Sequence, residues 1–313
     1  MNWLLFAFIW TIFAWIASTL MDVVARSNAG KMWQYKWLVL QYIAISSVAL
    51  LMLLGAHVFF AIPLIPASMS VQTIWMLLLI GCIGFWWIWC LFKWFEKLNP
   101  AIALVIAQLT VFIQYFINIR LFDASESLST LKIILALIFF FCIWQFLFQK
   151  QKKQSTQSFS LNTYALYPLW TALCRSAFTI ANTYFIKNDI FHPIQSLFFT
   201  ETAVWIIALL VYAISYWYTK PSKTALSENK LFAWLQQKDI LTYVWIWLTQ
   251  VVWFLFFYVA YTDTASNTVN IIRLFQIMFT WLFARILFKQ KMNKKNILLM
   301  ICAFCILLTF VLI

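Results

Sequence analysis

Three charged side chains stand inside long apolar segments of the sequence. They are Arg175, Glu201 and Arg273. A charge at the centre of a bilayer costs about 2.5–3.5 kcal/mol on insertion scales, so each needs a partner or a watery cavity. An arginine in such a place could grip a carboxylate or phosphate in bidentate fashion, and the glutamate could bind a proton. The alternative is a buried ion pair between Glu201 and an arginine that only fixes helix register.

Uncharged polar side chains accompany these charges within the apolar segments. Asn270 and Gln276 each stand three residues from Arg273, which places them near one face of a helix. A hydrogen bond between helices explains any one of them, whereas their convergence favours a polar cavity. The candidate substrate-binding residues with polar or charged groups are Arg273, Arg175, Asn270, Gln276, Gln108, Asn118, Asn182 and Gln250.

An aromatic stripe forms one further candidate surface, in the segment 239–261. Trp247, Gln250, Phe254 and Tyr258 fall on one side of the helix expected there. Such a stripe could stack on a planar organic solute or surround a cation, with ordinary packing as the alternative. We therefore add Trp247 and Tyr258 to the candidate substrate-binding residues.

Two acidic residues are candidates for binding a coupling proton. Glu201 lies well inside an apolar segment, and Asp22 lies near the end of the first one, where a solvated helix end is the alternative. No cofactor or metal site is expected. The six cysteines all lie within apolar segments, where they pack as small hydrophobic residues.

The composition shows what kind of chain carries these polar groups. Hydrophobic residues make up 65% of it, charged residues 10%, and the mean hydropathy is +0.88. A soluble chain of this size could not bury so much apolar surface. The apolar runs are roughly 18–25 residues long, which is the length of a helix that crosses about 30 Å of hydrocarbon. The sequence therefore predicts an all-α integral membrane protein.

The segmentation predicts ten transmembrane helices. Lys and Arg are concentrated in the loops after the odd-numbered helices, whereas the other loops hold only Arg120, Lys132 and Lys187. The positive-inside rule therefore places both termini outside the cytoplasm of a multi-pass cell-membrane protein, as in a bacterial inner membrane. The expected spans are residues 3–25, 35–60, 71–95, 99–121, 129–149, 161–186, 193–218, 239–261, 264–287 and 296–313.

An internal repeat organises these ten helices. Residues 99–149 align with residues 263–313 without a gap, and the match is carried by the hydrophobic pattern. We therefore expect a first repeat at residues 1–150, a linker at 151–160 and a second repeat at 161–313. Because five is an odd number, the two five-helix repeats must be inverted relative to each other, as in many transporters.

Three short stretches carry a resemblance to a known family. Residues 94–101 (WFEKLNPA), residues 126–129 (ESLS) and residues 258–266 (YVAYTDTAS) resemble motifs of the drug/metabolite transporter superfamily, in its ten-helix EamA-like branch. The resemblance covers nearly the whole chain, although only four glycines are present where the family is usually glycine-rich. It implies a metabolite permease or exporter.

These observations together predict a secondary transporter of a small organic metabolite that works by alternating access. Two buried arginines against one glutamate favour an amino acid or another zwitterionic or anionic solute. The first alternative is efflux of cationic drugs through Glu201 and the aromatic residues. The alternative from another class is a scaffold protein of the membrane that transports nothing.

The sequence also bears on partners and energy source. It has no phosphate-binding loop for ATP, so a proton or ion gradient, or exchange, is the expected driving force. The basic residues lie in short loops, which points to the lipid bilayer and not to nucleic acid as their partner. An enzyme is not expected, because no compact cluster of His, Asp and Glu is seen. The chain is expected to act as a monomer or a homodimer.

Overall fold

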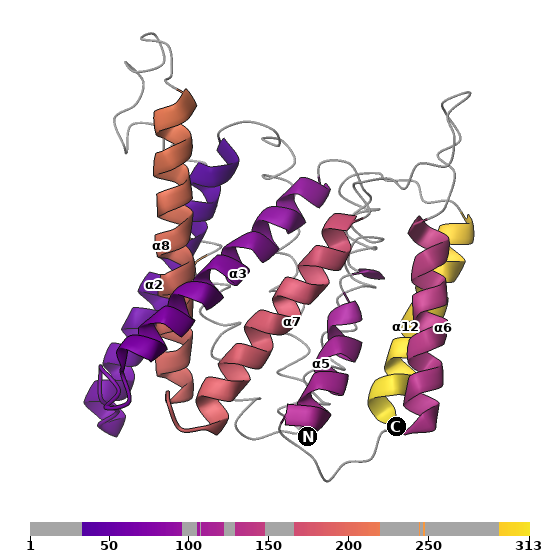
Figure 1. Ribbon diagram of the computed structural model, residues 1–313, viewed down its shortest axis with the longest axis horizontal. Helices are drawn as coiled ribbons and strands as arrows, with labels where there is room; N and C mark the ends of the chain where they lie inside the picture. The colour runs from indigo at the N-terminus through magenta and orange to yellow at the C-terminus, as the bar shows by residue number, and fades with distance from the viewer. Residues whose placement is uncertain are drawn as a thin grey trace. The chain divides into compact units, whose positions relative to one another are not determined.

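The computed structural model describes residues 33–95, 105–106, 108–121, 129–147, 166–219, 244, 247 and 294–313. All the regular structure in this part of the chain is α-helical (Figure 1). The helices are α2 (Trp33–Phe60), α3 (Val71–Phe95), α5 (Leu109–Leu121), α6 (Thr130–Leu147), α7 (Leu166–Lys187), α8 (Pro193–Thr219) and α12 (Lys294–Leu312).

Three of the described helices contain segments long and apolar enough to cross a membrane. These segments are Leu38–Phe60, Val71–Cys90 and Pro193–Tyr218, and Thr130–Gln145 is a shorter apolar helix. Large apolar side chains are also widely exposed, with Phe59 at 80% and Trp217 at 75%. Lipid is the solvent that accommodates such a surface. The chain is thus an all-α membrane protein, as its composition predicted.

The predicted helix boundaries agree with the structure to within a few residues in six of the seven described helices. The predicted spans 3–25, 239–261 and 264–287 lie outside the described residues, apart from Val244 and Trp247, which are helical.

The prediction of one continuous helix over residues 99–121 is wrong at Gln108. Val105 and Ile106 are helical, Gln108 forms a turn, and α5 begins at Leu109. The Gln108 N–H donates to the Val105 carbonyl at 3.2 Å, and the Val111 N–H donates to the Gln108 carbonyl at 2.9 Å. Both bonds span three residues, which is tighter than the α-helical spacing. Periodicity could not reveal this break, because apolar residues continue on both sides of it.

The chain forms two compact units, each assembled from both halves of the sequence. The first unit contains α5, α6, α12, the part of α7 up to Ile180 and the part of α3 from Trp86. The second unit contains α2, α8, α3 up to Phe85 and the end of α7 from Ala181.

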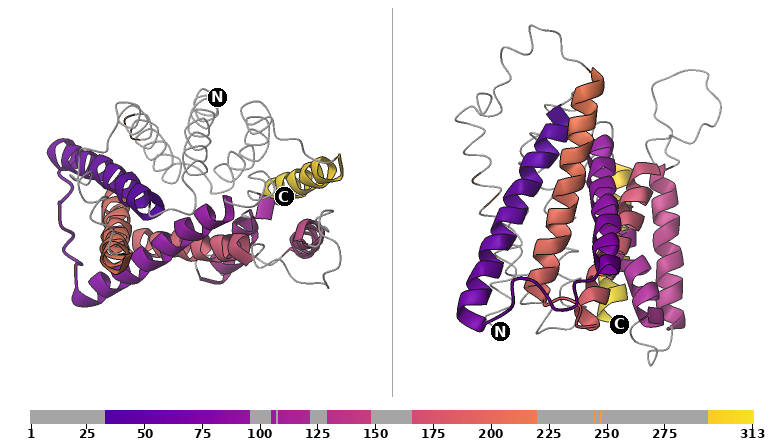
Figure 2. Two further views of the ribbon diagram at one scale, coloured as in Figure 1. Left: turned by 90° about the horizontal axis from the view of Figure 1, so that it is seen from above. Right: turned by 60° about the vertical axis from the view of Figure 1, so that its left-hand side comes forward.

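In the first unit α6 packs along α12 (Figures 1 and 2). Lys132, at the start of α6, has its Nζ 5.7 Å from the centre of the Phe310 ring, at the end of α12. The two helices are therefore antiparallel. Their first residues, Thr130 and Lys294, are also aligned with each other in the internal repeat.

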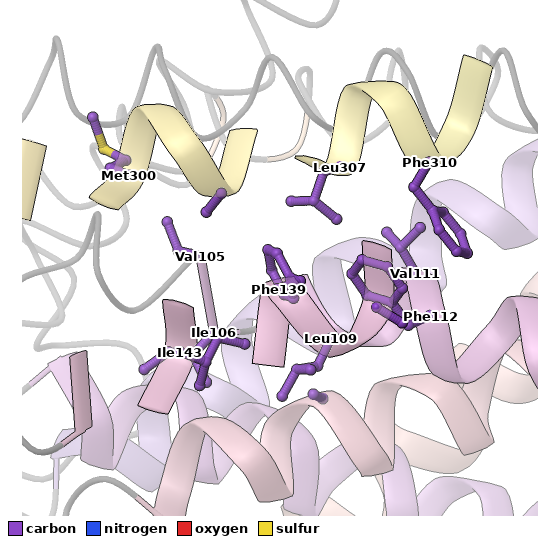
Figure 3. Packing of buried hydrophobic residues seen from close by; sticks show 13 residues of the cluster. Val105, Ile106, Leu109, Val111, Phe112, Phe139, Ile143, Met300, Leu307 and Phe310 are labelled. Atoms are coloured by element: carbon purple, nitrogen blue, oxygen red, sulfur yellow. The ribbon is translucent and has the colours of Figure 1, made fainter. Parts of the chain in front are cut away.

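The core of the first unit lies where α5 meets these two helices. The Phe112 ring centre is 4.8 Å from that of Phe139 and 4.4 Å from that of Phe310, and all three side chains are buried. Figure 3 shows Leu109 of α5 and Leu307 of α12 near the same cluster. This packing holds Leu109 and Phe112, on one side of the start of α5, among apolar side chains.

In the second unit α2 packs along α8 (Figures 1 and 2). Gln195, in the first turn of α8, donates from Nε2 to the carbonyl of Pro63, just after α2, at 2.5 Å. The two helices are therefore antiparallel. A Cβ added to Gly81 of α3 would lie 2.8 Å from the backbone carbon of Ala203 in α8, so α3 and α8 touch backbone to backbone.

The connection between α7 and α8 is fixed by its own hydrogen bonds. Asp189 has a left-handed φ of 52°, and the Ile190 N–H donates to the Phe185 carbonyl at 3.0 Å, which closes α7 with a Schellman motif. At the start of α8 the His192 N–H donates to Gln195 Oε1 at 2.8 Å, and His192 Nδ1 accepts from the Ile194 N–H at 3.4 Å. This reciprocal pair is a capping box that uses histidine and glutamine.

Candidate functional site

The structure describes five of the twelve predicted site residues in full. These are Arg175, Gln108, Asn182, Glu201 and Trp247. Asn118 lies in α5, but its side chain is outside the described part of the chain. Also outside it are Arg273, Asn270, Gln276, Gln250, Tyr258 and Asp22.

Arg175 lies in α7 and packs on an aromatic residue of α3. Its guanidinium carbon is 5.5 Å from the centre of the Trp87 ring, within the range of a cation–π contact. The Trp87 ring centre is in turn 6.0 Å from that of Phe178, one turn further along α7. An indole that covers one face of a guanidinium stabilises its positive charge.

A polar contact joins α5 to α7 about one turn from Arg175. The Thr110 Oγ1 donates to the Ala172 carbonyl at 3.4 Å, and the Ser176 Oγ donates to the same carbonyl at 2.8 Å. All three residues are buried. The contact fixes the position of the Arg175 segment against the start of α5.

Two buried glutamines of the first unit have side-chain amide donors with no partner among the described residues. Gln108 is 2% exposed and Gln114 is 6% exposed, and the Nε2 atom of each makes no hydrogen bond with the described residues. A buried polar group without a partner costs about 1–3 kcal/mol. Gln114 follows Thr110 by one helical turn, which places it on the side of α5 that meets α7. The first unit therefore combines a cation with unused hydrogen-bond donors.

Glu201 lies in α8 of the second unit and is partly buried. Tyr42 of α2, which is 2% exposed, lies within electrostatic range of it. No lysine or arginine among the described residues acts on the carboxyl group. An acid in that setting must bind a proton or another cation to avoid the cost of a bare charge.

Hydroxyl groups near Glu201 differ from those elsewhere in the described helices. Ser47 and Thr200 donate to carbonyls of their own helices at 2.7 Å, which is the usual way to satisfy a helical hydroxyl. By contrast, the buried hydroxyl oxygens of Ser46 in α2 and Thr202 in α8 make no hydrogen bond with the described residues. The second unit therefore holds an acid and unused oxygen atoms.

Two further polar atoms of the second unit are buried without a partner in the described part of the chain. They are Gln41 Oε1 in α2 and Trp205 Nε1 in α8. Trp205 follows Glu201 by one helical turn, so the two lie on one side of α8.

Asn182 belongs to the second unit, whereas Arg175 belongs to the first. Its Oδ1 accepts a hydrogen bond from Ser196 Oγ at 2.9 Å, which joins α7 to α8. In the sequence, Asn182 follows Arg175 by seven residues, which is about two helical turns. The structure gives Asn182 a packing role that the spacing could not reveal.

Sequence reasoning missed several residues that the structure brings to these sites. Trp87 gave no distinct signal in the sequence, because it lies in a run of aromatic residues that covers every face of α3. Tyr42 and Ser46 were missed because single polar residues within a long apolar helix such as α2 give no periodic signal. Only their position against α8 distinguishes them. Among the described residues, no group of three or more His, Cys, Asp or Glu side chains could hold a metal ion.

Comparisons with known proteins identify the fold and leave the activity open. No protein-family model matches the chain, and no curated protein matches it. One solved crystal structure, described only as that of a protein, is similar to this chain with a TM-score of 0.59. The alignment covers 97% of this chain and 96% of the other chain. The two sequences are 13% identical, so the similarity shows a shared fold over nearly the full length of both.

Proposed function

We propose that the chain is a secondary transporter of a small organic solute that carries a carboxylate, such as an amino acid or another zwitterion or anion. The observation that supports this best is the combination in the first unit of Arg175 with the unpartnered amide donors of Gln108 and Gln114. Donors and a cation inside a membrane protein fit an acceptor with negative charge.

The proposed architecture is ten helices in two inverted repeats. Two observations favour it. The helices α6 and α12 begin at positions that the repeat aligns, and they pack antiparallel, as equivalent helices of inverted repeats would. The end of α12 lies beside the start of α6, which fits a C-terminus on the side opposite the basic loops.

In this proposal Glu201 binds the coupling proton. Its carboxyl group lies within electrostatic range of the buried Tyr42 and has no cationic partner among the described residues. Exchange of the proton with either side of the membrane would let a pH gradient drive the solute. Asp22 stays a second candidate from the sequence.

The direct test is a counterflow assay with the purified chain in liposomes. Vesicles are loaded with unlabelled L-glutamate, L-alanine or succinate. They are then diluted into buffer that contains a trace of the same compound in labelled form. We expect labelled carboxylate to accumulate with the wild type and not with Arg175→Ala. Thr309→Ala is the matched control, because its exposed hydroxyl donates to the Cys305 carbonyl of its own helix.

A second candidate, efflux of organic cations, has one observation in its favour. Glu201 lies beside Tyr42, and Trp205 lies one turn further along α8, so an acid and aromatic rings share one region. Comparison of Glu201→Gln with Arg175→Ala separates the two candidates. Loss of ethidium efflux in the glutamate variant, with no carboxylate counterflow in the wild type, would favour the cation.

A further inference from the structure

The break before α5 lies at a depth where irregular backbone needs a reason. The helix α5 contains 13 residues from Leu109 to Leu121, which is about 20 Å along its axis. In the ten-helix architecture proposed above, α5 ends its span at Leu121, which places the first residue of α5 well inside a hydrocarbon layer about 30 Å thick. In membrane proteins, irregular backbone at this depth is tolerated only where it is enclosed by protein or lines a cavity.

The start of a helix carries a partial positive charge. About half an elementary charge is attributed to the unpaired N–H groups of the first turn, and anions bind there. Within a membrane this charge is poorly screened, so the broken end of a helix is a common way to hold an anionic group.

Gln108 provides an independent observation at the same place. It directly precedes α5, and only 2% of its surface is exposed. Its Nε2 atom has no hydrogen-bond partner among the described residues. A residue before a helix commonly uses its side chain to accept from the first turn. Here the side chain instead offers an unused donor beside the positive end of α5.

The neighbouring helix adds a full positive charge. Thr110, in the first turn of α5, donates to the Ala172 carbonyl of α7 at 3.4 Å, and Arg175 follows Ala172 by three residues. A helix end, an amide donor and a guanidinium thus belong to neighbouring segments of one unit. An anion with several acceptor oxygens could interact with all three groups at once.

We propose that the start of α5 is a carboxylate-binding site, with Gln108 as a ligand-binding residue. The inference rests on the proposed transport function and names the part of the chain that binds the solute's acidic group. Gln108 donates to one carboxylate oxygen, the first turn of α5 stabilises the charge, and Arg175 supplies the countercharge.

Thermal unfolding of the purified chain in detergent tests the site without any need for transport. Sodium acetate and sodium L-glutamate are compared with sodium phosphate and with sodium chloride at equal ionic strength. A ligand that binds the native state raises the unfolding temperature by mass action. We expect the two carboxylates to raise it above the chloride baseline, and above phosphate, in the wild type.

Gln108→Leu is the decisive variant, because leucine is similar in size and carries no polar atom. Removal of an unpartnered donor should leave the ligand-free protein as stable as the wild type or more stable. Carboxylate affinity should fall about tenfold, the usual effect of one lost charge-assisted hydrogen bond. Gln114→Leu, with the same change further along α5, should reduce affinity less.

Three outcomes would overturn the site. The wild type could fail to respond to either carboxylate, phosphate could stabilise it more than they do, or Gln108→Leu could respond as the wild type does. A lower unfolding temperature for ligand-free Gln108→Leu would show that the amide has a structural role instead.

Counterflow of a neutral solute without carboxylate stabilisation would retain transport and reject this site. Stabilisation without counterflow would retain the site and reject transport.

Discussion

The two compact units hold side chains of opposite charge within their apolar helices. The first has a cation, Arg175, and unpartnered amide donors beside a broken helix. The second has an acid, Glu201, and unpartnered oxygens of Gln41 and Ser46. Its helices α2 and α8 are continuous over 28 and 27 residues. The first unit therefore suits an acceptor with negative charge, and the second suits a proton or another cation.

The two units also differ in where their irregular backbone lies. In the second unit hydrogen bonds close the helix ends, and Ser68 Oγ donates to the Ile190 carbonyl at 2.5 Å across two connections. In the first unit the described irregularity lies at Gln108, within the segment that the sequence predicts as one span. Irregular backbone in the middle of a span indicates a binding region more strongly than irregular backbone at its ends does.

The largest expected effect comes from removal of the cation of the first unit. Arg175→Ala should reduce carboxylate counterflow at least about tenfold, because a charge-assisted bidentate contact is lost. Arg175→Lys should not restore it, since an ammonium group cannot bind a carboxylate through two parallel N–H groups. Initial rates in liposomes measure this.

Glu201→Gln sharpens the comparison of the two units. This substitution should leave carboxylate binding intact. It should abolish the acceleration of carboxylate transport by a pH gradient. Equal losses of binding in Arg175→Ala and Glu201→Gln would contradict the division of roles.

A stability effect of intermediate size is expected at Gly81. In Gly81→Ala the new Cβ would lie 2.8 Å from the Ala203 carbonyl oxygen, so α3 and α8 must move apart, at a cost of about 1–3 kcal/mol. Gly55→Ala is the matched control, because its Cβ would meet nothing within 4 Å. It should be neutral or stabilising by up to about 1 kcal/mol, from helix propensity. Denaturant unfolding in mixed micelles compares the pair, and equal effects would refute the close contact.

A smaller effect is expected from Trp87. Trp87→Leu removes a cation–π contact worth about 0.5–2 kcal/mol, so carboxylate affinity should fall several-fold as Arg175 loses its support. Trp87→Phe keeps an aromatic face and should recover most of the affinity. The dissociation constants come from ligand-dependent melting curves. If phenylalanine behaved as leucine does, the indole would be a packing residue only.

The smallest effect is expected from His192 at the start of α8. Partial burial lowers the pKa of His192 below its ordinary value, so the unfolded chain binds a proton more readily than the folded chain. Stability should therefore fall slightly as the pH drops from about 6.5, the ordinary histidine pKa, through the lowered value. Protonation also removes the Nδ1 acceptor of the Ile194 N–H. His192→Asn keeps a capping acceptor, so its melting temperature should lack this pH dependence.

The sequence by itself determined the class of the molecule and most of the described helix boundaries. Long apolar runs can only be helices in lipid, because every backbone group must find its partner within the segment. It also identified Arg175, Glu201 and Gln108, since a polar group in such a run is exceptional whatever surrounds it. These inferences depend on local composition, which is independent of tertiary contacts.

Only the tertiary structure decided which polar groups are satisfied and by whom. Asn182 and Gln108 look alike in the sequence, yet Asn182 accepts from Ser196 whereas the amide nitrogen of Gln108 has no partner in the described part of the chain. The contact of Trp87 with Arg175 and the break at Gln108 were equally hidden. Each depends on neighbours distant in sequence or on a local change of backbone spacing, and the hydrophobic pattern records neither.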